Sequence, residues 1–194
     1  QLLWNRQIRD RDAVEHFLNP SYKKDLHDPF LFRDMEKVVS RIFIAIENKE
    51  KIFVYGDYDA DGVTGSVILK STLDALGAIT ETYLPHREKE GYGLNSSAVS
   101  YMLSAGGRLV ITNDCGISNA EEIEEAQAKG MEVIVTDHHE PQDGQLPAAS
   151  SIINPKLKHS GYPYRELAGV GVAYKFAQAI SGSLLIDDLD LVTL

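Results

Sequence analysis

Two hydrophobic patterns alternate along the chain, one with the period of a helix and one with the character of a buried strand. Over residues 33–48, apolar side chains recur every three or four positions, which predicts a helix with one buried face. The positions are Met35, Val38, Val39, Ile42 and Ile46. Residues 52–55 are then continuously apolar or aromatic, which is typical of a strand covered on both faces in a parallel sheet.

The alternation of strand and helix continues along the rest of the chain. Further strands are predicted over residues 79–84, 109–112, 132–136 and 151–153. Further helices are predicted over residues 62–76, 96–104, 118–129 and 171–180. The helix at 118–129 opens with Ser118 and Glu121 at the spacing of a capping box. Repeated alternation of this kind predicts an α/β fold with a doubly wound, mainly parallel β-sheet flanked by helices.

The pattern also suggests how the chain divides. We expect residues 1–50 to form an N-terminal helical lead-in that packs on the core, and residues 51–194 to form one domain. At 194 residues with 43% hydrophobic composition, the chain is long enough for one sizeable core.

Composition adds limits on partners and location. The formal net charge of −10 gives no support for a nucleic-acid partner, so a phosphate-rich substrate would need metal ions or local basic residues. One cysteine, Cys115, excludes an internal disulfide framework and suits a reducing compartment. No apolar run reaches the length of a membrane span. We therefore expect a cytoplasmic protein with no membrane partner.

Polar clusters follow three of the predicted strands where each strand ends. They are Asp57, Asp59 and Asp61, then Asn113 and Asp114, then Asp137, His138 and His139. Since ligands of open parallel sheets bind beyond the carboxyl ends of the strands, these side chains are expected to share one rim. Carboxylates crowded together repel one another unless a cation neutralises them. The clusters therefore predict a shared metal centre.

The same residues also allow other interpretations. Asp-rich turns are common without any ion. The series at 57–62 also matches the first half of an EF-hand loop, but Ile68 stands where the bidentate glutamate belongs and a strand precedes the loop. A lone thiolate at Cys115 makes a poor zinc set. Oxygen ligands with one or two imidazoles favour Mn²⁺ or Mg²⁺, and we expect two ions that share a carboxylate and promote hydrolysis at phosphorus.

The three motifs resemble the DHH phosphoesterase superfamily and, within it, the RecJ family of bacterial exonucleases. They read GDYDADG at 56–62, NDCGIS at 113–118 and TDHHEP at 136–141. Supporting stretches include HREKEGYGLN at 86–95, INPK at 153–156 and LAGVGVAYK at 167–175. The resemblance implies a Mn²⁺- or Mg²⁺-dependent hydrolase that degrades single-stranded DNA from the 5′ end in recombination and repair. Its implied partners are single-stranded DNA and proteins of repair or replication.

The resemblance also implies roles for individual residues. The implied metal ligands are Asp57, Asp59, Asp61, Asp114 and His138, with Asp114 bridging the ions and acting in catalysis. His139 would act at the scissile phosphate, while Asp137 would orient an imidazole from outside the ligand set. Arg87 would contact phosphate and Tyr92 would offer a stacking surface on the route of the strand.

Two departures from the family pattern matter. Many members carry a histidine where this chain has Tyr55. Members also place a fourth-motif aspartate, and then a DHH-associated domain, beyond a segment like 189–194, so we expect a fragment that is inactive alone.

Alternative functions remain open at this point. One is a DHH phosphodiesterase acting on short oligonucleotides, cyclic dinucleotides or pyrophosphate. Another is a non-catalytic member that binds single strands or serves as a scaffold. A haloacid-dehalogenase-type phosphatase is disfavoured, because its chemistry has no place for an Asp-His-His cluster.

Overall fold

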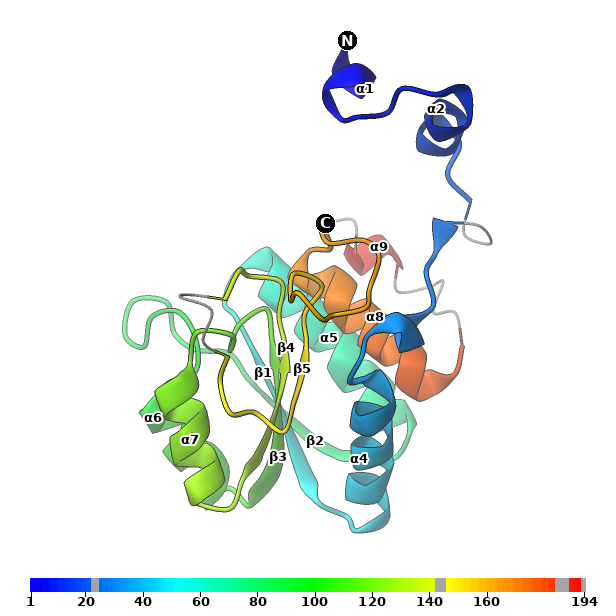
Figure 1. Cartoon of the computed structure of the whole chain (residues 1–194). Coiled ribbons are helices and arrows are strands. Elements are labelled where there is room, and N and C mark those ends of the chain that lie inside the picture. The colour runs from blue at the N-terminus through cyan, green and yellow to red at the C-terminus, as the bar shows by residue number, and fades with distance from the viewer. Residues whose placement is uncertain (22–24, 142–145, 184–188, 193–194) are drawn as a thin grey trace.

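The protein is built on one parallel sheet (Figure 1). The structure is a computed structural model, and it describes residues 1–21, 25–141, 146–183 and 189–192. The five strands lie in the order β2-β1-β3-β4-β5, and each neighbouring pair is parallel. They are β1 (Lys51–Gly56), β2 (Ile79–Tyr83), β3 (Gly107–Asn113), β4 (Glu132–Thr136) and β5 (Ser151–Ile153). The predicted α/β class with a doubly wound parallel sheet is confirmed (Figure 1).

Helices connect the strands and cover both faces of the sheet (Figure 1). The N-terminal elements are α1 (Leu2–Asn5), α2 (Arg11–Leu18), the 3-10 helix η1 (Pro29–Leu31) and α4 (Met35–Glu47). The others are α5 (Ala60–Ala75), α6 (Ser96–Ser104), α7 (Ala120–Ala128), α8 (Gly169–Ser181) and α9 (Leu189–Val192). The helices predicted from 3.6-residue periodicity are all present, and α6 has the predicted bounds.

Alternate residues of the strands face two separate cores. Ile52 and Val54 of β1 pack with residues of α4, α5 and α8 on one face. Phe53 and Tyr55 point to the other face and pack with residues of α6 and α7. All four side chains are fully buried. This explains the continuous apolar run of β1, because a strand covered on both faces has no polar side.

Four helices, α4, α5, α7 and α8, start two residues away from their predicted first residues, and contacts explain two of these differences. Helix α5 begins at Ala60 instead of near Gly62, because Asp59 caps it by accepting a hydrogen bond from the Gly62 amide at 2.9 Å. The predicted capping box of α7 is wrong. Asn119 occupies the N-cap position, and its side chain binds the backbone of Leu94 instead.

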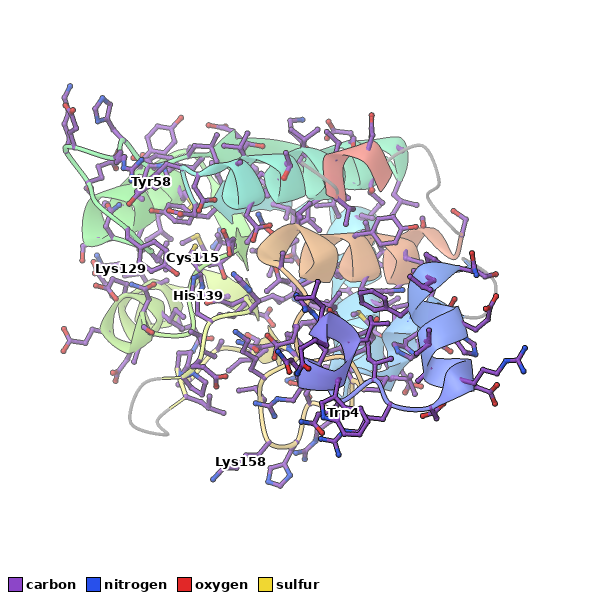
Figure 2. The ribbon with its side chains drawn as sticks, turned by 90° about the horizontal axis from the view of Figure 1, so that it is seen from above. Trp4, Tyr58, Cys115, Lys129, His139 and Lys158 are labelled. Carbon is purple, nitrogen blue, oxygen red and sulfur yellow. The ribbon has the colours of Figure 1, made fainter. Side chains whose placement is uncertain are left out.

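The N-terminal segment stands apart from the sheet in its first two helices. Neither α1 nor α2 has a buried residue, and Trp4 is 57% exposed (Figures 1 and 2). Further along, the buried Lys175 of α8 donates a hydrogen bond to the carbonyl of His27 at 2.7 Å. Helix α4 belongs to the same core as the sheet, so the division at residue 50 stays a prediction. Residues 193 and 194, where the predicted domain ends, lie outside the described residues.

The topology brings the predicted site residues to one rim. β1 lies between β2 and β3, so the chain runs from β1 to one side of it and then crosses to the other, and the order of the strands reverses there. Ligands of open parallel sheets bind at such a reversal, beyond the carboxyl ends of the strands. The polar clusters follow β1, β3 and β4, which are neighbours in the sheet. Within the described parts of the chain, no helix is long and apolar enough to cross a membrane.

Candidate metal centre

Asp114 stands at the centre of the rim, immediately after β3. Its backbone has φ of 62°, a left-handed conformation that non-glycine residues rarely adopt. Its amide donates to the carbonyl of Thr136 at 3.0 Å, which fixes the turn against the end of β4. The side chain is only 2% exposed. A strained backbone at a buried carboxylate is typical of a functional site.

The first candidate group of metal ligands joins the ends of β1 and β3. One carboxylate oxygen from each of Asp57, Asp59 and Asp114 lies within 4.8 Å of the others. Asp57 is buried, and its Oδ1 atom has no hydrogen-bond partner. Burial raises the pKa of the Asp57 carboxyl, and the neighbouring Asp59 carboxylate adds to the effect. A buried carboxylate oxygen left unpaired beside two further acids is a site that a cation would stabilise.

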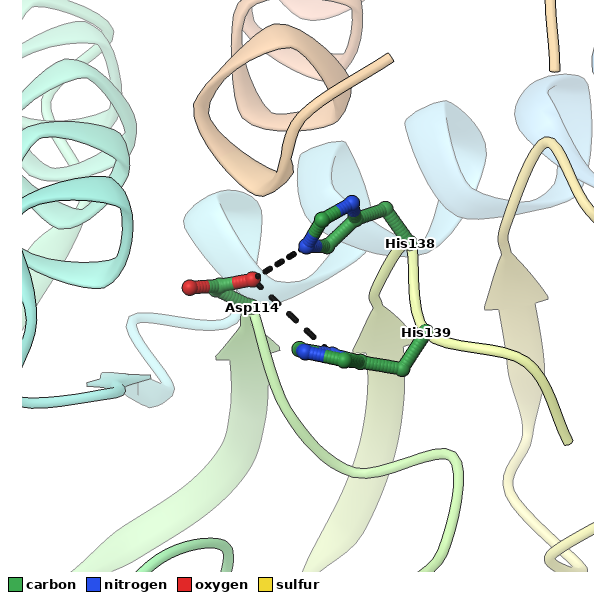
Figure 3. Close-up of side chains that lie close together, drawn as sticks. All are labelled: Asp114, His138 and His139. Atoms are coloured by element: carbon green, nitrogen blue, oxygen red, sulfur yellow. Dashed lines mark ion pairs between the residues drawn. The ribbon is translucent and has the colours of Figure 1, made fainter. Parts of the chain in front are cut away.

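The second candidate group joins the ends of β3 and β4. Ligand atoms of Asp114, His138 and His139 also lie within 4.8 Å of one another. The Nε2 atom of His138 is 3.1 Å from Oδ1 of Asp114, and Nδ1 of His139 is 4.0 Å from the same oxygen. Figure 3 shows both imidazoles directed at this carboxylate. Asp114 is therefore common to both groups.

The electrostatics of the shared carboxylate favour a bound cation. Burial raises the pKa of the Asp114 carboxyl to about 6, although the hydrogen bond from His138 acts in the opposite direction. That same hydrogen bond raises the pKa of His138. The metal-free site thus retains protons that a divalent ion would displace.

Asp137 lies beneath the two histidines and is fully buried. Its Oδ1 atom accepts hydrogen bonds from the amides of His138 and His139 and from Nδ1 of His139, the last at 2.7 Å. Its Oδ2 atom accepts from the Ile117 amide at 2.9 Å. Burial pushes the pKa of the Asp137 carboxyl upward, but these hydrogen bonds outweigh it and the pKa is lowered. The geometry suits a carboxylate that orients His139.

Asp61 is turned toward α8 and belongs to neither candidate group. Its two carboxylate oxygens accept hydrogen bonds from the amides of Gly169 and Val170, at 2.7 and 2.5 Å. Oδ2 of Asp61 is also 3.7 Å from Nε2 of His138. Asp61 therefore links the site to the N-terminus of α8, and its predicted role as a metal ligand stays a prediction.

The predicted substrate residues Arg87 and Tyr92 have different surroundings. The exposed guanidinium of Arg87 lies over the ring of Tyr58, 5.1 Å from its centroid, beside the GDYDADG turn. Tyr92 instead reaches into the site, where its hydroxyl oxygen is 3.1 Å from Nδ1 of His139 and 3.3 Å from the Asp114 carbonyl oxygen. Burial raises the pKa of the Tyr92 hydroxyl.

Tyr55, where the family resemblance led us to expect a histidine, is fully buried. Its hydroxyl donates to the carbonyl of Gly93 at 2.7 Å, and its ring stacks on Tyr83 with centroids 5.5 Å apart. It holds the 86–95 loop in place.

Sequence reasoning did not assign roles to several residues that shape the site. Asn113 donates from Nδ2 to the Gly62 carbonyl, and Asn154 donates to the carbonyl of His139. A Cβ atom on Gly169 would lie 2.4 Å from Oδ1 of Asp114. The INPK and LAGVGVAYK stretches contain two of these residues, so the motifs were visible although their contacts were not.

The residues present fit Mn²⁺ or Mg²⁺. Most of the candidate donors are carboxylate oxygens, the ligand type that suits these ions, and imidazole nitrogens lie beside them. Cys115 is fully buried in the core on the α6 and α7 side, and it is in neither candidate group.

Comparison with known proteins identifies the family of the chain. The model of the DHH family, N-terminal domain, matches residues 51–193. The chain belongs to the DHH family. Over 193 residues, covering the whole chain, it is 45% identical to the single-stranded-DNA-specific exonuclease RecJ of Bacillus subtilis, of which it spans 24%. This DHH chain is thus homologous to RecJ but corresponds to about a quarter of that relative.

Solved structures of RecJ show the same fold with metal. A crystal structure of exonuclease RecJ bound to manganese matches with a TM-score of 0.77 and 34% identity, over 86% of this chain and 43% of that one. RecJ from Thermus thermophilus in complex with Mg²⁺ matches with a TM-score of 0.57 and 25% identity, over 98% of this DHH chain and 22% of that chain.

Proposed function

We propose that this chain is the DHH part of a metal-dependent phosphodiester hydrolase that removes nucleotides from the 5′ end of single-stranded DNA in recombination and repair. The observation that carries the proposal is the position of Asp114, which belongs to both candidate ligand groups. A carboxylate shared in this way is what two neighbouring ions need as a bridge. Homology to RecJ supports the choice of single-stranded DNA as substrate. We propose the cytoplasm as its location.

The proposed ligands are Asp57, Asp59, Asp61, Asp114 and His138, which would hold two ions of Mn²⁺ or Mg²⁺ in the complete enzyme. Bound there, the ions supply positive charge for phosphate oxygens and activate water as the nucleophile. Asp114 would hold the ions in a fixed place, because its carboxylate is buried and the amide bond to Thr136 fixes the turn after β3.

His139 is the proposed catalytic residue at the scissile phosphate. Its Nδ1 atom is held by Asp137 at 2.7 Å, which leaves Nε2 directed away from that carboxylate and free to meet a phosphate oxygen. Its ring side chain is 43% exposed, so substrate can reach it. From this position an imidazole stabilises developing negative charge or donates to the leaving oxygen.

The proposed strand path runs along the 86–95 loop. Arg87 is exposed over the Tyr58 ring and would contact a phosphate of the incoming strand. In a chain with a net charge of −10, such a local cation matters for attracting the strand.

The metal centre is tested first, by calorimetry and thermal unfolding of this chain with Mn²⁺. We expect Mn²⁺ to raise the melting temperature and Asp114→Ala to remove most of the rise. Asp12→Asn removes a charge from exposed α2 and serves as the matched control. Absence of any Mn²⁺ binding would contradict the metal centre.

The reaction is tested in the full-length protein. Single strands labelled at the 5′ or 3′ end, duplexes and cyclic dinucleotides are supplied with Mn²⁺. We expect nucleotides to be released from the 5′ end of single strands. Release only from the 3′ end would refute the polarity, while cleavage of dinucleotides alone would favour the small-substrate alternative.

A further inference from the structure

We infer that Tyr92 is a positioning residue whose hydroxyl holds together the two loops that carry His139 and Asp114. In the sequence, Tyr92 suggested a stacking surface for the substrate strand. The structure instead places its hydroxyl oxygen between Nδ1 of His139, at 3.1 Å, and the carbonyl oxygen of Asp114, at 3.3 Å. The inference deepens the proposed function and rests on it for its kinetic consequence.

The direction of the hydrogen bonds follows from Asp137. Its carboxylate accepts from Nδ1 of His139 at 2.7 Å and already accepts three backbone amides. An ionised carboxylate has no proton to donate, so Nδ1 carries the hydrogen. Tyr92 oxygen can then accept a share of this N–H while its own O–H donates to the Asp114 carbonyl. One hydroxyl thus makes both contacts.

The ring of Tyr92 supports the same role. It meets the His139 ring edge to face, with centroids 5.6 Å apart and an interplanar angle of 73°. This contact limits rotation of the imidazole about its χ2 angle. Asp137 and Tyr92 therefore restrain His139 from two sides.

The backbone next to Tyr92 is itself fixed. The Tyr55 hydroxyl donates to the Gly93 carbonyl at 2.7 Å. Asn119 pairs with both backbone groups of Leu94, at 3.0 and 3.1 Å. These contacts fix the backbone that carries Tyr92, as a positioning residue requires.

Asp114 gives the second contact its importance. Its left-handed backbone, with φ of 62°, is a conformation that persists only where the surroundings impose it. A hydrogen bond to its carbonyl is one such restraint, in addition to the bond from its amide to Thr136. Asp114 belongs to both candidate ligand groups, so loss of the Tyr92 hydroxyl, which bonds to its carbonyl oxygen, would affect both.

The first test measures His139 directly and needs no enzyme activity. In metal-free wild-type chain, NMR detects the His139 Nδ1 proton, assigned by its absence in His139→Gln. We expect Tyr92→Phe to speed exchange of this proton with solvent about tenfold, because one of its two acceptors is lost. Tyr101→Phe, which removes an exposed hydroxyl bonded to Glu81, should leave the rate unchanged. An unchanged rate in folded Tyr92→Phe would overturn the inference.

The second test separates positioning from stacking, in the full-length protein with single-stranded DNA and Mn²⁺. We expect Tyr92→Phe to lower kcat about tenfold with KM changed less than about twofold, because a misplaced imidazole slows the reaction without weakening substrate binding. Full activity in Tyr92→Phe, with a raised KM in Tyr92→Leu, would identify a stacking residue and overturn the inference. If the wild type hydrolyses no DNA, the proposed function fails, and proton exchange still decides the role of Tyr92.

Discussion

Gly169 lies directly against the carboxylate of Asp114, so closely that a Cβ atom on this glycine would be 2.4 Å from Oδ1. Gly169 is the first residue of α8, and its amide donates to Asp61 at 2.7 Å. The start of α8 therefore packs on the shared carboxylate with no space for a side chain. The LAGVGVAYK stretch therefore forms the start of a helix and also packs closely against the candidate metal centre.

Gly169→Ala is expected to displace the Asp114 carboxylate. The cost in the free energy of unfolding should be about 1–3 kcal/mol, as for overpacking of a filled site, and Mn²⁺ affinity should fall about tenfold. Urea unfolding and calorimetry measure the two effects. Gly171→Ala is the matched control on the same helix, since the nearest atom to its Cβ would be Cδ2 of the Leu167 side chain, at 3.2 Å. Equal behaviour of the two variants would contradict the close packing on Asp114.

Asp57→Asn should have opposite effects on the stability of the metal-free chain and on its stabilisation by Mn²⁺. Burial raises the pKa of the Asp57 carboxyl, so its charge is unfavourable in the metal-free chain at neutral pH. We expect the neutral amide to increase the free energy of unfolding by about 1 kcal/mol without metal. The Mn²⁺-induced rise in melting temperature should fall to less than about half. Undiminished stabilisation by Mn²⁺ would remove Asp57 from the ligand set.

The stability of the metal-free chain should depend on pH through Asp114. Its pKa is about 6 in the folded protein, above the ordinary value of 3.8, because of burial. The protonated form therefore contributes stability that is fully present below about pH 4 and is lost as pH rises through about 6. The raised pKa of His138 acts in the same direction.

Comparing wild type with Asp114→Asn isolates this contribution. The free energy of unfolding is measured by chemical denaturation in EDTA. Between pH 4 and pH 7.5, that of the variant should rise by about 1–3 kcal/mol relative to that of the wild type, since one pKa unit corresponds to about 1.4 kcal/mol. Mn²⁺ affinity of the wild type should rise over the same interval, because protons compete with the ion. A pH-independent difference would refute the raised pKa.

Tyr55→Phe should destabilise the 86–95 loop. The variant leaves the Gly93 carbonyl without the buried hydrogen bond that it receives at 2.7 Å. The expected loss in the free energy of unfolding is about 1–3 kcal/mol. Tyr101→Phe, whose hydroxyl bond to Glu81 is exposed, should change it by less than about 0.5 kcal/mol. A loss below that of the control would show that Tyr55 does not anchor the loop.

Much of the fold could be predicted because its signals are local. The continuous apolar run at 52–55 was enough to predict a strand buried on both faces, and this strand is β1 (Lys51–Gly56). The start of α7 was missed for a different reason. Ser118 and Glu121 have capping-box spacing, but Asn119 at the N-cap is held by Leu94, a contact 25 residues away that local spacing does not encode.

The candidate site likewise has features that the sequence predicted and features that it did not. The residue types at the strand ends, and the parallel order of the strands, were enough to bring Asp57, Asp114 and His138 to one rim. The direction of each carboxylate was not predictable. Asp61, which belongs to the same motif as Asp57, accepts a hydrogen bond from the amide of Gly169, 108 residues further along the chain.

The sequence by itself determined the alternating elements, the parallel sheet and the family, because periodicity and motif letters are properties of neighbouring residues. Only the tertiary structure decided that Asp114 is common to two ligand groups, that Gly169 closes over it, and that Tyr92 meets His139 across 47 residues. Those relationships depend on side-chain direction and on packing between distant segments. They arise only when the core has brought the strand ends and α8 together.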